Sequence, residues 1–219
     1  MQKTATPLVL LTGFEAFAGG RRNPSAEAVT ALAAAPPASI RIASAILPVT
    51  YAGAGEALRA AIRRYGPDIV VCTGLASGRP TMCVERVAIN IDDARIADND
   101  GIRRIDTPVV PGAPAAYFAT LPIKAIVARM REAGVPAQVS QTAGTFLCNH
   151  VFFALCHFAA TQAPGLRGGF IHVPSLPEQA LENGEPSMAL PVIVTGLRAA
   201  LEAVRDTAED LRVAEGATH

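Results

Sequence analysis

The amino-acid sequence predicts an α/β fold. Half of the 219 residues are hydrophobic, short apolar runs alternate with longer amphipathic stretches, and Gly and Pro separate several of them. This alternation is typical of strands joined by helices that cover a sheet. No repeat, low-complexity tract or interdomain linker divides the chain. We therefore expect one domain over residues 1–219, with a frayed tail over 214–219.

The first part of the chain alternates between strand and helix. Strands are expected over 8–11, 40–47 and 69–72, and helices over 24–35 and 51–65. The strand segments are short and apolar, whereas the helical segments are longer and mix apolar with polar residues. Asn23 is the expected N-cap of the first helix, and Gly66 is expected to end the second.

The remainder is less regular. The segment 75–110 has no helical period, and only 87–91 within it is expected to form a strand, followed by an acidic loop. Beyond it we expect helices over 121–133, 147–160 and 190–213 and strands over 137–140 and 170–173. Pro174 is expected to end the last strand, because proline cannot donate to a sheet ladder.

Composition excludes several classes of function. Nineteen basic residues balance 19 acidic ones, and such a chain gains little from counterion release, so nucleic acid is not an expected partner. The most apolar stretch, Val151–Ala160, is shorter than the roughly 18 residues of a membrane-spanning helix. Residues 1–7 lack the apolar core of a signal peptide. We expect a cytoplasmic globular protein without membrane contact.

Unusual residues gather where a ligand would bind. In open α/β sheets the ligand crevice lies just beyond the carboxyl ends of the strands. The segments expected at that place are 13–17, 74–79, 142–149 and 172–174. Glycines after strands are ordinary turn residues, so the prediction depends on the combination of a cysteine, a histidine, phenylalanines and acidic residues at one rim.

Cys148 is the expected nucleophile. It stands at the start of the helix over 147–160, where free backbone N–H groups and the helix dipole lower a thiol's pKa and can hold an oxyanion. The alternative is a small core residue, as we expect for Cys72 and Cys156; Cys83 stays open as a reactive thiol. Four cysteines are too few for a disulfide scaffold, and no C-x-x-C pair indicates zinc.

A thiol hydrolase needs a general base, and the chain has four histidines. On a helix, His150 and His157 would diverge from Cys148 by about 200° and about 900°, so both would face away from it. His219 is the last residue. Elimination leaves His172 at the end of a separate strand, and the alternative is a half-buried strand histidine held by the backbone.

A carboxylate would orient the imidazole. Spacing does not choose among Glu85, Asp92, Asp93, Asp98, Asp100 and Asp106. The acidic run 92–101 lacks the ligand spacing and the glutamate at the twelfth position of a calcium loop, so we expect neither a metal nor a cofactor. Arg95 and Arg79 are expected to balance these acids.

Five blocks of sequence carry a resemblance. They are Leu11–Phe17 with Asn23–Ser25, Gly78–Arg79 with Glu85–Asn90, Asp92–Ile96 with Asp98–Asn99, Thr142–His150, and Gly169–Pro174 with Leu176–Gln179. In this order, over about residues 8 to 200, the chain resembles the pyroglutamyl peptidase I (pyrrolidone-carboxylate peptidase) family. These cysteine peptidases remove an N-terminal pyroglutamyl residue from peptides.

The resemblance implies an open three-layer α/β/α sandwich with a mostly parallel, mixed central sheet. The residues to which it gives roles are a catalytic triad of Cys148, His172 and Glu85, a slot for the pyroglutamyl ring made by Phe14, Phe17 and Phe146, and Asn23 and Arg95 near the oxyanion. It thereby selects the carboxylate. It also implies a cytosolic homotetramer whose partners are pyroglutamyl peptides.

The chain departs from the family at one turn. Leu75 and Ser77 stand where many members carry Gln and Gly, so a side-chain contact to the ligand is expected to be missing there. A nucleoside phosphorylase of the same architecture is an alternative, although only Arg21 and Arg22 offer positive charge near the first Gly loop. A catalytically silent binding protein with a decayed site is another.

Overall fold

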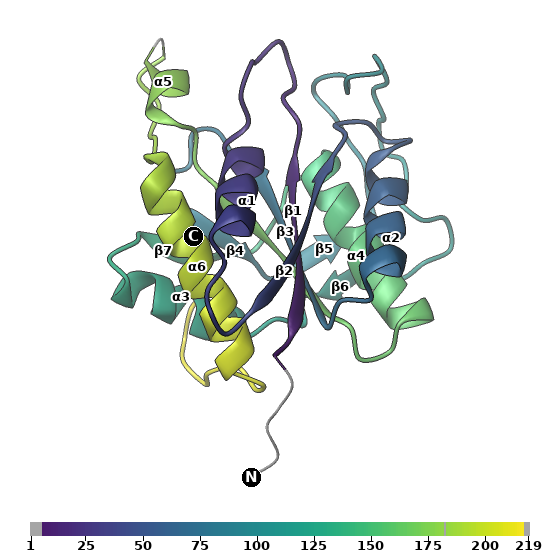
Figure 1. Cartoon of the computed structure of the whole chain (residues 1–219). Helices are drawn as coiled ribbons and strands as arrows, with labels where there is room; N and C mark the ends of the chain where they lie inside the picture. Colours follow the sequence, from purple (N-terminus) through teal and green to yellow (C-terminus); the bar gives the residue numbers. More distant parts are fainter. Residues whose placement is uncertain (1–5, 182, 217–219) are drawn as a thin grey trace.

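A six-stranded sheet lies at the centre of the protein (Figure 1). The computed structural model describes residues 6–181 and 183–216. The strands are β1 (Leu8–Phe14), β2 (Arg41–Leu47), β3 (Ile69–Leu75), β4 (Met82–Glu85), β7 (Ala137–Ser140) and β8 (Arg167–Val173), in the order β2-β1-β3-β8-β4-β7. β2, β1, β3 and β8 are parallel, whereas β4 runs antiparallel to β8 and parallel to β7. The expected mixed, mostly parallel sheet is confirmed.

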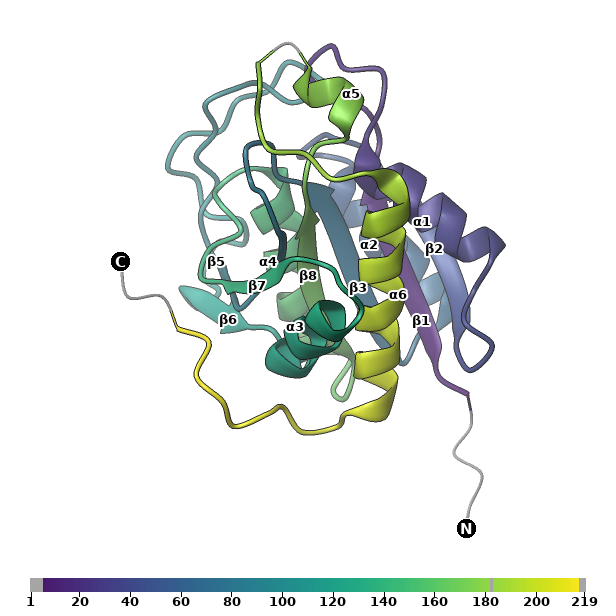
Figure 2. The same cartoon turned by 90° about the vertical axis from the view of Figure 1, so that its left-hand side faces the viewer.

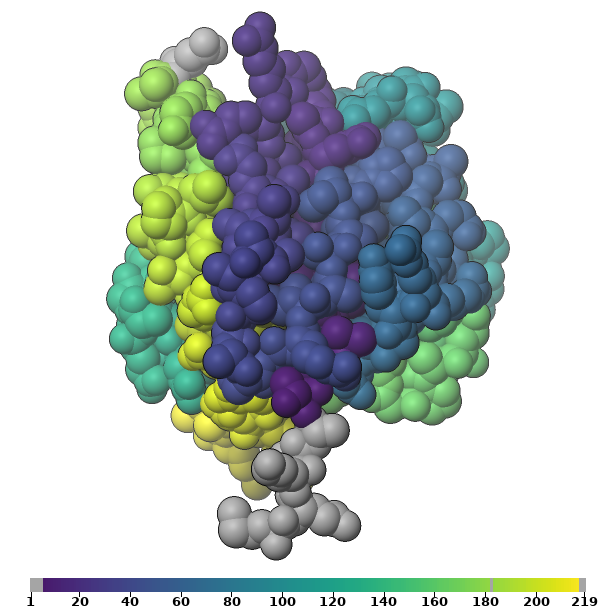
Figure 3. All heavy atoms as spheres, viewed as in Figure 1, coloured from purple at the N-terminus to yellow at the C-terminus, as the bar shows by residue number. Residues whose placement is uncertain are grey.

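Helices cover both faces of this sheet. They are α1 (Pro24–Ala34), α2 (Ala54–Tyr65), α3 (Ile123–Glu132), α4 (Leu147–Gln162), α5 (Pro177–Ala180) and α6 (Leu190–Asp206). α1, α3 and α6 lie on one face and α2 and α4 on the other (Figures 1 and 2), and α1 packs beside α6 (Figure 3). Val9 and Leu11 face one core and Leu10 the other, because successive side chains of a strand point to opposite faces. The three-layer sandwich is confirmed.

The predicted helix boundaries rest on side-chain and backbone chemistry that the structure contains. Asn23 is the N-cap of α1, where its Oδ1 accepts a hydrogen bond from the backbone N–H of Ser25 at 3.0 Å. Gly66 ends α2 with a φ of 55°, a left-handed conformation that costs glycine least. β1 and β3 run on to Phe14 and Leu75, three residues further than expected in each case.

The expected helix over 190–213 is wrong in its last turns. α6 ends at Asp206, and the chain then turns so that the Asp210 carboxylate accepts hydrogen bonds from the backbone N–H groups of Lys124 and Ala125, at 3.0–3.1 Å. Asp210 thus caps the start of α3 from a distant part of the sequence, where a negative charge also meets the positive end of the helix dipole.

Three short elements also differ from expectation. In the tail, Glu215 pairs with Arg131 at 2.6 Å, and the rest of the tail that is expected to fray, 217–219 with His219, lies outside the described residues. β4, β6 (Ala116–Phe118) and α5, which have three or four residues each, are present in addition to the expected elements. β6 pairs with β5 (Val87–Ile89) in a separate two-stranded sheet. No helix within the described ranges is long and apolar enough to cross a membrane.

The cap that Asp210 supplies can be measured. Replacing Asp210 by Ala leaves two N–H groups at the start of α3 without an acceptor, and we expect a loss of about 0.5–2 kcal/mol in the free energy of unfolding. Urea titration followed by circular dichroism measures it. Glu209→Ala, one residue earlier and exposed, is the matched control. Equal stability of the two variants would contradict the assignment.

Candidate active site

Three sequence segments meet at the carboxyl edge of the parallel strands, which is the upper edge in Figure 1. They follow β1 and β3 and precede α4, and the end of β8 lies among them. This is the rim that the sequence predicts. The structure brings all eight predicted site residues to this rim. Seven of them line one or both of two adjoining cavities, and the eighth, Glu85, contacts His172, which lines the larger cavity.

Cys148 belongs to the first turn of α4 and lies over β3. A Cβ atom added at Gly74 would stand 2.8 Å from the Cys148 Sγ and 2.9 Å from Phe170 Cζ, so only glycine leaves room for the thiol. Gly74 is the register partner of His172 on the neighbouring strand. Register partners on adjacent strands lie about 4.8 Å apart with side chains on the same face, so the thiol and the imidazole are neighbours.

His172 is held by a buried carboxylate. Its Nδ1 lies 2.7 Å from Glu85 Oε1, and the two side chains are almost inaccessible to solvent. An ionised carboxylate can only accept a hydrogen bond, so Nδ1 carries the proton and Nε2 is left as the basic nitrogen. Arg79 donates to the same carboxylate oxygen at 3.0 Å and also to the Thr142 carbonyl at 3.1 Å. The expected balancing role of Arg79 is the one that it has here.

The electrostatics of the thiol differ from the sequence-based expectation. Burial raises the pKa of the Cys148 thiol to about 12, and the negative charge of Glu85 contributes to the rise, while Arg79 opposes it. The helix start was expected to lower this pKa. Loss of hydration outweighs the dipole, because the thiol sits between the sheet and the loop before α4. At neutral pH the resting thiol therefore carries its proton and needs a base.

A small apolar slot opens beside the thiol. Its volume is about 50 Å³, and its lining residues are Phe14, Phe17, Asn23, Val49, Leu75, Phe146, Leu147 and Cys148. The three phenylalanines named from the sequence therefore form one pocket with the thiol. The rings of Phe17 and Phe146 are 6.5 Å apart, and Tyr51 meets Phe146 edge-on at 5.8 Å. Sequence reasoning did not identify Tyr51, which supports the Phe146 ring from behind.

A larger cavity of about 490 Å³ adjoins the slot. Leu75, Phe146 and Cys148 line both spaces, but His172 lines only the larger one. Arg95 also lines the larger cavity and is exposed, and it does not line the slot. The wall between the two spaces thus carries the Cys148 thiol.

Asn23 is a structural residue as well as a lining one. Its Oδ1 accepts from Ser25, and its Nδ2 donates to the carbonyl of Glu15 at 2.9 Å. One amide hydrogen of Asn23 is thereby engaged and one remains for a ligand in the slot. The first backbone N–H groups of α4 lack acceptors within the helix, which provides a second set of donors close to Cys148.

The other histidines are engaged elsewhere. His150 Nδ1 lies 2.9 Å from Asp92, whose carboxylate also accepts from Arg104 at 2.8 Å, and the Arg104 guanidinium lies 4.6 Å above the Tyr51 ring. His157 bonds to the Tyr117 hydroxyl at 3.0 Å. Neither histidine lines the slot or the larger cavity.

Asn149 fixes the position of its neighbour Cys148, a role that sequence reasoning missed. Its Oδ1 accepts from the Ile89 N–H at 3.0 Å, and its Nδ2 donates to the carbonyls of Ile89 at 2.8 Å and Ile91 at 3.0 Å. The fully buried side chain therefore pairs with β5 as an added strand would. A buried amide directly after a candidate nucleophile is the signal that could have revealed it.

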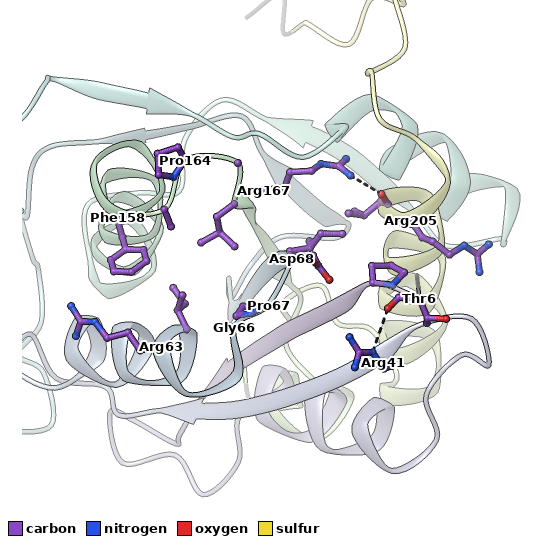
Figure 4. Close-up of a pocket in the computed structure, with 17 residues that line it drawn as sticks. Thr6, Arg41, Arg63, Gly66, Pro67, Asp68, Phe158, Pro164, Arg167 and Arg205 are labelled. Carbon is purple, nitrogen blue, oxygen red and sulfur yellow. Dashed lines mark hydrogen bonds between the residues drawn. The ribbon is translucent and has the colours of Figure 1, made fainter. Parts of the chain in front are cut away.

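A cavity larger than both of these is not this site. It measures about 970 Å³ and lies at the opposite, amino-terminal edge of the sheet, where α2 and α4 end (Figure 4). Four arginines and Asp68 line it, and Arg167 there donates to carbonyls at the end of α6. None of the predicted site residues lines it. Arg63 and Arg205 lie in the last turns of α2 and α6, where positive charge is favourable, and Arg41 on β2 donates to the Thr6 carbonyl at 3.3 Å.

A thiol, an imidazole and a buried carboxylate at the carboxyl edge of an α/β sheet are the groups of a cysteine hydrolase. The family model described as "Pyroglutamyl peptidase" matches residues 8–207. The chain belongs to the pyroglutamyl peptidase family.

Individual relatives agree with this family. The chain is 55% identical to a pyrrolidone-carboxylate peptidase of Streptomyces coelicolor, over 96% of this chain and 99% of the relative. It is 51% identical to pyrrolidone-carboxylate peptidase 1 of Ralstonia nicotianae, over 97% of this chain and 100% of the relative. The crystal structure of pyroglutamyl peptidase I from Bacillus amyloliquefaciens matches with a TM-score of 0.93 at 42% identity, covering 95% of this chain and 99% of that one.

The alternative functions gain no support. Arg22, one of two candidate phosphate ligands, is paired with Glu27 at 2.6 Å and lies 3.7 Å from Glu178. The relatives are named as peptidases, not as phosphorylases or binding proteins.

The contact between Gly74 and the thiol gives a prediction. Gly74→Ala would push a methyl group against Sγ, and we expect kcat/KM for a pyroglutamyl amide to fall about 10- to 100-fold while stability falls by about 1–3 kcal/mol. Gly168→Ala is the matched control: its Cβ would stand 2.9 Å from Leu155 Cδ2, a similar clash on the same strand as His172 but away from the thiol. Equal losses of activity would contradict a specific contact.

The raised pKa of Cys148 gives a second prediction. A thiol is neutral below its pKa, and the thiolate is the form that reacts with iodoacetamide. The rate of Cys148 alkylation should therefore keep rising with pH and reach no plateau below about pH 9. An ordinary cysteine, with a pKa of about 8.5, would approach its plateau near that pH. Mass spectrometry of the peptide that contains Cys148 measures the rate at each pH. A plateau near neutral pH would show a preformed thiolate and contradict this description.

Proposed function

We propose that the chain releases N-terminal pyroglutamate from peptides with Cys148 as nucleophile, His172 as general base and acid, and Glu85 as the carboxylate that orients His172. The observation that carries this proposal is the 2.7 Å contact of Glu85 with His172 Nδ1, beside a cavity that His172 and Cys148 line together. It leaves Nε2 as the nitrogen available to the thiol.

The reaction follows from this arrangement. His172 accepts the thiol proton as the sulfur attacks the pyroglutamyl carbonyl, which removes the need for a preformed thiolate. Backbone N–H groups at the start of α4 stabilise the oxyanion. The imidazolium then donates its proton to the leaving amine, and water hydrolyses the thioester with His172 again as base. Glu85 stabilises the imidazolium in both halves of the reaction.

We infer that the apolar slot binds the pyroglutamyl ring. The ring is an uncharged lactam, so apolar walls and a few hydrogen bonds suit it better than a charged side chain. Phe14, Phe17 and Phe146 supply the walls, and the free amide hydrogen of Asn23 is a donor for the lactam or the oxyanion. Leu75 adds apolar surface where family members offer an amide, so ring recognition here depends more on packing and backbone groups. We assign Arg95 to the outer side of the oxyanion, where it lines the larger cavity.

We further propose one peptidase domain over residues 1–219 that acts in the cytoplasm as a homo-oligomer, a tetramer by family resemblance. The exposure of Phe118, at 71%, on the outer strand β6 supports contact with a second copy. Sedimentation equilibrium measures the association state, and a monomer at micromolar concentration would contradict this proposal.

Substitution of the thiols tests the nucleophile. Cys148→Ala should abolish release of a fluorophore from its pyroglutamyl amide, because the other cysteines are fully or nearly fully buried away from the slot. Cys156→Ala, two helical turns along α4, is the matched control and should retain activity, and Cys83→Ala tests the remaining thiol. Full activity of the Cys148 variant would end the proposal.

Two further measurements separate the roles. Glu85→Gln preserves size but not charge, and we expect kcat to fall by about 10² to 10⁴-fold.

A comparison of two substrates tests the slot. The pyroglutamyl amide should be hydrolysed and the matching prolyl amide, which lacks the lactam carbonyl, should not. Equal rates for the two amides would contradict the slot and leave the triad standing.

A further inference from the structure

We propose that the larger cavity binds the residue that follows pyroglutamate, and that Ile96 makes this subsite prefer an apolar side chain over glycine or a charged one. The inference rests on the proposed function and specifies which peptides it favours.

The direction of the leaving group follows from the two cavities. The slot is lined by Cys148 but not by His172, whereas the larger cavity is lined by both. His172 must deliver a proton to the departing amine nitrogen, so that nitrogen and the residue attached to it lie on the side of His172. With the ring in the slot, the following residue has the larger cavity as its space. Its volume of about 490 Å³ falls within the range of pockets that bury a ligand, about 300–1,000 Å³.

The charges around this cavity cancel. Arg79 is neutralised by Glu85, to which it donates at 3.0 Å. Asp93 and Arg95 are exposed, carry opposite charges and lie two residues apart on the same loop. A positively or negatively charged substrate side chain therefore meets no excess of the opposite sign.

Two aliphatic residues of the wall, Ile96 and Leu75, lie outside the hydrophobic core. Ile96 lines the cavity and is 45% exposed, and Leu75 is only partly buried. An aliphatic side chain in the substrate would cover both and remove their surface from water. Of these two residues, Leu75 also lines the slot, so Ile96 is the one whose substitution leaves the slot lining unchanged.

The loop that carries Ile96 is fixed before any substrate binds. Asp93 N donates to the Thr145 carbonyl at 2.9 Å, and the Thr145 hydroxyl donates to the Asp93 carbonyl at 2.7 Å. On the other side of Ile96, the buried Asp98 carboxylate accepts from the backbone N–H groups of Tyr51 and Ile102, both at 2.8 Å. Ile96 is thus held between two anchored points, and a wall that is ordered in advance loses little entropy on binding.

The test uses pyroglutamyl tetrapeptides that differ only in the residue after pyroglutamate, which is Gly, Leu, Lys or Asp. For the unaltered chain we expect kcat/KM for Leu to exceed that for Gly by about 5- to 10-fold, the effect of partly burying a leucine side chain. Lys and Asp should differ from each other by less than about threefold, because the charges of the wall cancel.

Ile96→Asp should lower the Leu-to-Gly ratio to below about two and raise the Lys-to-Asp ratio at least about fivefold. Ile102→Asp is the matched control: Ile102 is 52% exposed on the same loop and lines neither cavity, so both ratios should stay unchanged. Thermal unfolding of both variants checks that they fold.

Three outcomes overturn the inference: no preference for Leu over Gly in the unaltered chain, unchanged ratios in Ile96→Asp, or equal changes in Ile102→Asp. These outcomes differ from a failure of the proposed function. If the peptidase assignment is wrong, the unaltered chain releases no pyroglutamate from any of the four peptides.

Discussion

The hydrogen bond between His172 and Glu85 depends on the direction in which one strand runs. β4 is antiparallel to β8, with Cys83 opposite His172. Glu85 therefore lies two residues deeper in the sheet than the level of His172, and its side chain reaches Nδ1 from inside the protein. A carboxylate buried this completely is costly unless it is paired. Arg79, in the short connection between β3 and β4, supplies the compensating charge.

The antiparallel direction of β4 also explains which parts of the site the sequence could predict. Buried strands, the Asn23 cap and the Gly66 stop follow from local patterns and are present in the structure. The sequence placed Cys148 and His172 at the rim because each ends or begins an element that local patterns identify. Glu85 could not be selected from spacing, because β4 is four residues long and only its pairing with β8 brings this carboxylate to the imidazole. Family resemblance, not periodicity, identified it.

Local sequence patterns also do not predict polar contacts between residues that are distant in the sequence. Asn149 donates to and accepts from backbone groups 58 to 60 residues away, and Asp210 accepts from backbone groups 85 to 86 residues away. Buried backbone N–H and C=O groups need hydrogen-bond partners. These side chains provide partners for backbone groups that have none within a helix or a sheet. The irregular stretch between β4 and α3 is consequently as firmly tied to α4 as a strand would be. This attachment lets a loop rather than a helix form one wall of the site.

The thiol shows why burial and catalysis have to be considered together. Under the proposed function the apolar slot holds an uncharged ring, and the burial that such a slot requires also raises the pKa of the Cys148 thiol. A sulfur in that environment cannot stay ionised at rest, so the proton has to move during the attack rather than before it. The base must therefore be in place beside the thiol, in the larger cavity, with its tautomer already fixed. Glu85 and Arg79 meet that requirement, because their contacts hold His172 with Nε2 free before any substrate arrives. Under the proposed function, the recognition of a neutral ring and the need for a His172 tautomer that is fixed in advance thus both follow from the apolar surroundings of the thiol.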